Sequence, residues 1–108
     1  MITVTFYCKN DGLIGFKSEG HAGYDESGKD IVCAAVSTLV FTTIHAIKDL
    51  TEDAFSGEED SEHAFVEFVI TEEKPSDAAG VLLKAFRIGI ESVEKGNSPY
   101  LRVISKEV

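Results

Sequence analysis

Apolar and polar residues alternate at both ends and in the middle of this chain, and each alternating stretch predicts a strand. Residues 2–8 and 13–17 alternate with period two on either side of a turn-forming Asn-Asp-Gly at 10–12, so they predict a hairpin. Residues 53–60 and 64–71 flank an acidic run, and they predict a second hairpin whose tip is charged and solvated.

A helical period replaces this alternation in two segments. From 31 to 50 apolar residues recur at helical spacing around most of the circumference, which predicts a central helix. Pro-Ser-Asp at 75–77 begins a second helix and Asn-Ser-Pro at 97–99 ends it, before a last short strand over 100–104. One face of this second helix carries Leu82, Phe86, Gly89, Ile90 and Val93.

The element order β-β-α-β-β-α-β predicts an α+β fold over residues 1–108. We expect a single domain, in which a mainly antiparallel sheet packs with two helices. At this size such an arrangement leaves one sheet face or one helix face partly uncovered. A two-fold symmetric dimer is therefore expected.

Composition narrows the classes of partner. The chain of 108 residues has nineteen acidic and ten basic residues, which gives it a formal charge of −9. This charge is expected to repel phosphate backbones and anionic lipid and to attract basic proteins. It is also a common way for a protein to stay soluble. Direct nucleic-acid binding is therefore not expected. No basic leader opens the sequence and no apolar run approaches the roughly 18 residues of a membrane span, so we expect a cytoplasmic protein without membrane contact.

Cys33 is the most informative residue for chemistry. It lies three residues after Asp30, and an aspartate before an apolar run is typical of a helix N-cap. Cys33 would then be the third helical residue, where the helix dipole favours a thiolate and unpaired backbone N–H groups could hold an oxyanion. The alternative is that Cys33 is an inert core residue beside small apolar neighbours.

Three further residues could support a thiol nucleophile. His21, between Gly20 and Ala22, could reach Cys33 from the facing loop and act as its base, or could be a plain surface histidine. Asp30 is most simply a helix cap and could also orient His21. Ser37 lies one turn after Cys33, where its hydroxyl could bond the sulfur or an oxyanion, or bond back to the carbonyl of Cys33.

Metal and cofactor chemistry is not expected. Cys8, Cys33, His21 and His45 lack paired metal-ligand spacing, and both cysteines are expected to be free thiols. His45 and His63 are expected on the surface. The segment from Gly20 to Lys29 carries three glycines without periodicity, so it is expected to be a mobile loop that closes over a peptide.

Gly20-His21-Ala22, together with the run Gly28-Lys29-Asp30-Ile31-Val32-Cys33-Ala34-Ala35-Val36-Ser37, resembles the signature of the ribosomal-processing cysteine protease family. The length and element order are similar as well. The resemblance implies a homodimeric cytoplasmic endopeptidase. Its substrate would be the precursor of large-subunit ribosomal protein twenty-seven, cut after a Phe-Phe pair to remove a short N-terminal extension.

The same resemblance implies residue roles. His21 would be the base and Cys33 the nucleophile, while Asp30, Ser37 and Gly20 match supporting positions. Two other function classes remain open from the residues alone. One is a non-enzymatic ribosome-associated module that binds protein. The other is a thiol redox sensor that pairs Cys33 with Cys8.

Overall fold

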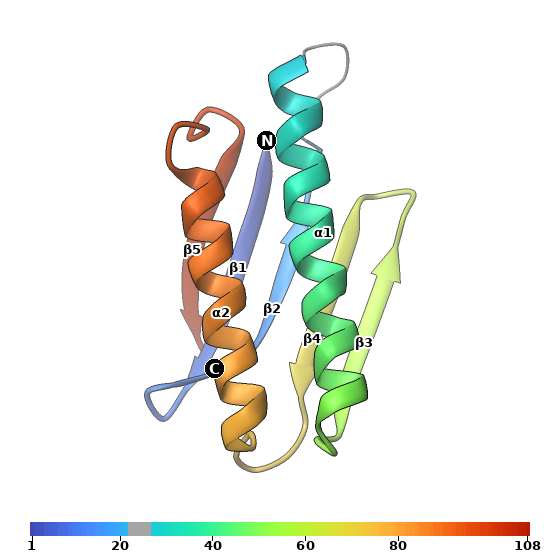
Figure 1. The fold of residues 1–108 in the computed structure, drawn as a ribbon, viewed down its shortest axis with the longest axis vertical. Coiled ribbons are helices and arrows are strands. Elements are labelled where there is room, and N and C mark those ends of the chain that lie inside the picture. Colours follow the sequence, from blue (N-terminus) through green and yellow to red (C-terminus); the bar gives the residue numbers. More distant parts are fainter. Residues whose placement is uncertain (22–26) are drawn as a thin grey trace.

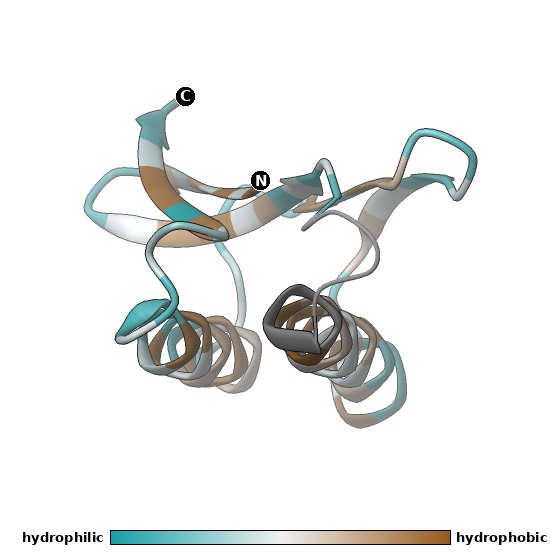
Figure 2. Cartoon of the chain, turned by 90° about the horizontal axis from the view of Figure 1, so that it is seen from above, coloured by the Kyte–Doolittle hydropathy of each residue, from teal (hydrophilic) through white to brown (hydrophobic). Residues whose placement is uncertain are grey.

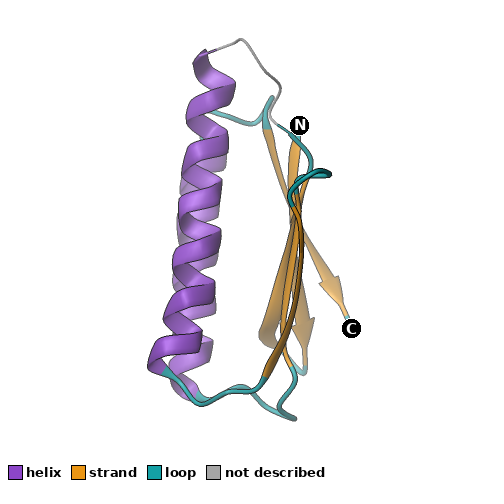
Figure 3. Cartoon of the chain, turned by 90° about the vertical axis from the view of Figure 1, so that its right-hand side faces the viewer, coloured by secondary structure: helices purple, strands orange, loops and turns teal. Residues whose placement is uncertain are grey.

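A five-stranded sheet covered on one face by two helices forms the molecule (Figures 1 and 3). The structure, a computed structural model, describes the backbone of residues 1–21 and 27–108 and the side chains of 1–21 and 31–108. Its elements are β1 (Ile2–Lys9), β2 (Gly12–Glu19), α1 (Ser27–Leu50), β3 (Phe55–Asp60), β4 (Phe65–Ile70), α2 (Asp77–Glu94) and β5 (Leu101–Glu107).

The strand order across the sheet is β3-β4-β2-β1-β5. Both predicted hairpins are confirmed, and β2 pairs antiparallel with β4 to join them. The last strand is longer than the pattern predicts. It pairs parallel to β1, with Ile2 opposite Leu101, so the α+β fold class is confirmed and the sheet is mixed.

The second helix begins where the sequence predicts. Ser76 is its N-cap and accepts a hydrogen bond from the amide of Ala79 at 3.1 Å. Asp53 holds this cap from the other side, because one carboxylate oxygen accepts from the Ser76 amide at 2.8 Å and the other from its hydroxyl at 2.5 Å. The segment before β3 is thereby fixed to the start of α2.

Four phenylalanines form the centre of the core between the sheet and the helices. Phe86 of α2 stands 4.3 Å from Phe16 and 5.5 Å from Phe6, measured between ring centroids, and Phe68 stacks on Phe16 at 5.7 Å. All four are buried. Their cross-strand pairing on β1, β2 and β4 sets the register that carries β3 and β4 to the side of α1.

Phe86→Ala is expected to lower the free energy of unfolding by about 3–5 kcal/mol, because it removes two aromatic contacts and leaves a cavity. Denaturant titration followed by circular dichroism measures the loss. Phe55→Ala serves as the matched control, since Phe55 is 37% exposed. Its expected loss is about 1 kcal/mol, and equal losses in the two variants would contradict this account of the core.

The sheet face away from the helices carries mostly polar residues, together with apolar ones such as Val69 and Ile104. Alternate residues of β1, β2 and β4 point to it, including Thr3, Lys17 and Glu67. Tyr7 lies across Gly15 and donates a hydrogen bond to Glu67 at 2.5 Å. Partial burial and the neighbouring Glu67 carboxylate raise the pKa of the Tyr7 hydroxyl well above its usual range.

The expectation that no segment reaches the length of a membrane span is wrong for α1. By length and composition alone, Ile31–Leu50 could cross a bilayer, with a mean hydropathy of 1.7. Core helices of soluble proteins share these properties. In this fold the segment packs on the sheet through Val32, Val36, Val40 and Ile47, all of which are buried.

Candidate active site

Cys33 lines a groove between α1 and the β3–β4 hairpin. This hollow, the Cys33 groove, has a volume of ≈ 180 Å³, and its floor includes Ile2 and Ser18. The Cys33 side chain is half-buried, so it packs on the core with one side and faces the groove with the other. The apolar residues along the groove are Val36, Val40, Phe41, Phe65 and Val66.

Helix α1 starts earlier than the sequence suggests. It begins at Ser27, so Asp30 stands inside the first turn and is not the N-cap, and Cys33 is the seventh helical residue. Only the first four N–H groups of a helix lack intrahelical acceptors, and the dipole effect is strongest in the first turn. The expectation that backbone N–H groups at Cys33 hold an oxyanion is therefore wrong.

Ser37 lies one turn after Cys33 and lines the same groove. Its side chain is exposed. Thr38 and Thr43 each bond back to the carbonyl four residues earlier, at 2.9 and 2.7 Å, but Ser37 makes no such bond to Cys33 in the described part of the chain. Its hydroxyl is therefore free to bond a group in the groove.

Gly20 brings the end of β2 to the groove. Its φ of +94° favours glycine, and a Cβ there would collide with the carbonyl oxygen of Met1. The Gly20 amide donates to the carbonyl of Ala64 at 3.1 Å. The next residue, His21, is exposed, and its carbonyl accepts a hydrogen bond from the Met1 nitrogen at 2.6 Å.

The structure thus brings three of the predicted site residues, Gly20, Cys33 and Ser37, into one groove. His21 follows Gly20 in the chain but is not among the residues that line the groove. Among described residues, no hydrogen bond joins the His21 imidazole to the Cys33 thiol. Residues 22–26 and the Asp30 side chain lie outside the described part, and so does the predicted mobility of the loop they belong to. Residues 27–29, included in that predicted loop, are helical.

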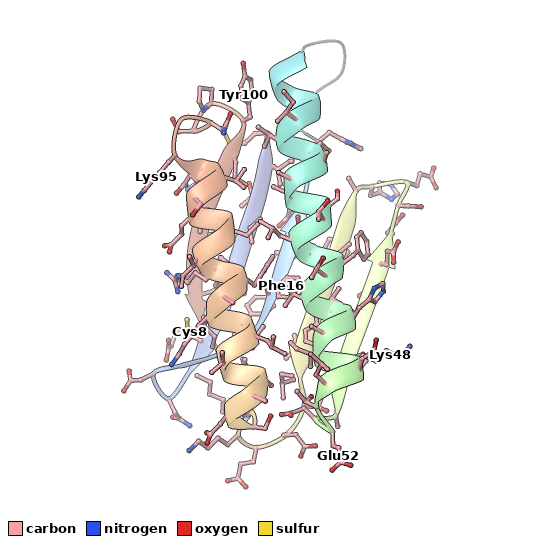
Figure 4. All side chains as sticks on the ribbon, in the orientation of Figure 1. Cys8, Phe16, Lys48, Glu52, Lys95 and Tyr100 are labelled. Carbon is pink, nitrogen blue, oxygen red and sulfur yellow. The ribbon has the colours of Figure 1, made fainter. Side chains whose placement is uncertain are left out.

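The remaining cysteine and histidines stand apart from this site. Cys8 is a free thiol near the end of β1 (Figure 4). Ile2, at the start of the same strand, lines the groove. Six residues of strand are about 20 Å, far beyond disulfide reach, so the redox sensor based on a Cys8–Cys33 disulfide is excluded. His45 and His63 are exposed as predicted, and His63 bonds Asp60 at 2.6 Å.

Sequence reasoning missed the far wall of the groove. Phe65, Val66 and Glu59 come from the second hairpin, whose position beside α1 depends on strand order. The side of the groove formed by α1 could have been found from the sequence. Cys33, Ser37 and Phe41 recur every fourth residue, so they share one face of the helix. No cluster of side chains suited to hold a metal occurs among the described residues.

The family model described as cysteine protease Prp matches residues 1–102 of the chain. The chain belongs to this family. Prp proteins are cysteine proteases, so this chain is an enzyme that cleaves peptide bonds. The alternative of a non-enzymatic binding module is wrong.

Individual relatives agree with this assignment. The ribosomal processing cysteine protease Prp of Bacillus subtilis is 30% identical over 107 residues, covering 95% of this chain and 96% of the relative. SMU.848 from Streptococcus mutans shares the fold with a TM-score of 0.87 and 27% identity, over 100% of this chain and 96% of that one.

A second similar structure contains a bound peptide. It is the essential ribosomal processing protease Prp of S. aureus in complex with a covalently linked product peptide. Its TM-score is 0.88 at 25% identity, and the match covers 98% of this chain and 100% of that one.

Proposed function

We propose that this Prp protease removes the short N-terminal extension from the precursor of large-subunit ribosomal protein twenty-seven, cutting after a Phe-Phe pair. The observation that carries the proposal is the apolar groove beside Cys33, because Phe41, Phe65 and Val66 offer an aromatic substrate side chain a matching surface. The negative charge of −9 favours a basic ribosomal protein as substrate.

Cys33 and His21 carry the chemistry in this proposal. The Cys33 thiolate attacks the scissile carbonyl carbon, the C–N bond breaks, and protonated His21 gives its proton to the leaving amine. His21 then takes a proton from water, which attacks the thioester; the C–S bond breaks, the acid is released, and the Cys33 thiolate and protonated His21 are restored. The Ser37 hydroxyl, which faces the same groove, donates to the oxyanion during both steps.

Incubation with a synthetic precursor peptide containing Phe-Phe-Ala, followed by mass analysis, tests the substrate. We expect a single cut between Phe and Ala. A peptide with both phenylalanines replaced by alanine should be cut far more slowly, because it loses the apolar burial in the groove. Equal cleavage of the two peptides, or cleavage elsewhere, would refute the proposed specificity.

We also propose that the protease acts in the cytoplasm, where ribosomal precursors are made, and acts as a homodimer. The two helices expose large apolar side chains, with Ile31, Val81 and Ile88 exposed by 68%, 64% and 66%. Side chains between Ile31 and Ile47 carry no acidic or basic group apart from His45. In a chain of charge −9, an uncharged helical surface is where a second copy meets the least repulsion.

Light scattering at micromolar concentration is expected to report twice the mass of one chain. Ile88→Lys should shift the protein to a monomer, because it places a charge on the exposed apolar face of α2. Glu72→Lys, a charge change at an exposed position after β4, is the control and should leave the dimer intact. A monomeric mass for the unmodified protein across this range rejects the dimer.

A further inference from the structure

A second hollow continues the Cys33 groove along α1. This distal hollow has a volume of ≈ 290 Å³ and includes Ile44 and His45 of the helix and Phe55 and Gly57 of β3. Phe41, Glu59 and Val66 line both hollows. The two are therefore neighbouring parts of one channel between α1 and the hairpin.

The distal hollow exists because the sheet is wider than its helical cover. Gly57 and Glu59 stand directly opposite Phe68 and Val66, so they point to the helix side of the sheet. Yet every residue of β3 from Phe55 to Glu59 is exposed, because α1 and α2 stop short of this edge strand (Figure 2). Gly57 has no side chain, so no side chain fills the distal hollow at this position.

The channel has the length of a short extended peptide. From Cys33 to His45 the helix rises about 18 Å, and an extended chain covers that span with about five residues. Phe41, at the junction of the two hollows, is about 12 Å from Cys33 along the helix axis, or about four peptide residues.

The walls of the channel differ in chemistry. Phe41, Ile44 and Phe55 give an apolar surface at the distal end, while Glu59 places a carboxylate at the junction. Glu59 makes no ion pair with any residue for which the structure gives a side chain. A carboxylate without a partner beside an apolar surface suits a bound peptide in which a basic residue is followed by an apolar one.

We propose that the distal hollow binds the substrate chain itself, about four residues from the scissile bond. A lysine or arginine at that distance pairs with Glu59, and an apolar residue beyond it packs on Phe41 and Phe55. This inference rests on the proposed function and adds a second specificity contact outside the cleaved pair. The occupant is an extended segment of the same polypeptide, since the two hollows are continuous with the nucleophile.

Gly57→Val tests the apolar part of the proposal. An added Cβ at Gly57 meets only the carbonyl oxygen of Glu67, at 3.7 Å, so the change is compatible with the fold while it fills the hollow. A long peptide carries Phe-Phe-Ala with six further residues on each side, including a lysine four residues from the cut. For this peptide we expect kcat/KM to fall about tenfold. A core peptide without these flanks should be cut at the unmodified rate.

Glu59→Gln tests the charge contact. We expect a two- to fivefold loss of kcat/KM for the long peptide, the range of an exposed ion pair. Glu62→Gln is the matched control, because it removes the same charge from the exposed turn of the same hairpin without lining the channel. Glu59→Lys should lower activity further, and a peptide with glutamate in place of the lysine should restore it.

Binding to the Cys33→Ala variant, followed by fluorescence anisotropy of the labelled long peptide, separates this inference from the proposed function. Weaker binding when Gly57→Val or Glu59→Gln is added supports the distal contact, even if the unmodified enzyme leaves the Phe-Phe bond uncut and the proposed substrate fails. Unchanged binding in both variants overturns the inference, and so does an equal loss with Glu62→Gln.

Discussion

Cys33→Ala is expected to abolish cleavage of the precursor peptide, with a loss of at least about a thousandfold in kcat. Alanine cannot form the thioester, and no other described cysteine lies near the groove. The fold should persist, since the change is small and alanine is favourable within a helix. Cys33→Ser should also be nearly inactive, because the hydroxyl is a much weaker acid than the thiol.

Mass analysis of the products measures this loss, and thermal unfolding confirms that the variant is folded. Cys8→Ala is the matched control, since Cys8 lies at the far end of β1 and should leave the rate unchanged. Turnover retained by Cys33→Ala, or lost equally by Cys8→Ala, would remove Cys33 from the mechanism.

His21→Ala is expected to slow acylation about 10²- to 10⁴-fold while peptide affinity stays nearly constant. The proposed role of His21 is proton transfer, and its exposed side chain is not among those that line the groove, so it is expected to add little apolar contact with a bound peptide. The rate of Cys33 alkylation by iodoacetamide should also lose its pH dependence near neutrality in this variant.

Single-turnover kinetics and binding measurements separate these two effects. His63→Ala is the control histidine, because its imidazole is exposed and bonded to Asp60 outside the groove. An alkylation profile that is the same with and without His21 would mean that this histidine does not act on the thiol.

Most of the fold could be predicted from the hydrophobic pattern. Period-two alternation located both hairpins, and helical spacing located both helices, because one-sided burial imposes these periods directly. The start of α1 was misplaced by four residues, from 31 to Ser27. Ser27 is as good a helix-starting residue as Asp30, and Gly28 and Lys29 weaken a helix without forbidding it.

Strand order could not be predicted in the same way. The alternation in residues 100–104 shows that this segment has two faces, but it does not show whether the segment pairs with β1 or with β3, nor in which direction. The proposal that Cys33 is the nucleophile came from its place after Asp30 in the sequence. The groove beside Cys33 was missed, because its far wall depends on β3 and β4 lying beside α1.

The parallel pairing of β1 with β5 has a consequence for how the enzyme first becomes active. The two hairpins and α1 join segments close in sequence and can form early, whereas Ile2 can meet Leu101 only after β5 has been made. Until then β1 has a free edge beside the strand end that contributes Ile2 to the Cys33 groove. A nascent chain that has not yet reached β5 is therefore expected to lack protease activity, and this protease becomes competent only once Leu101 and the strand that follows it have been made.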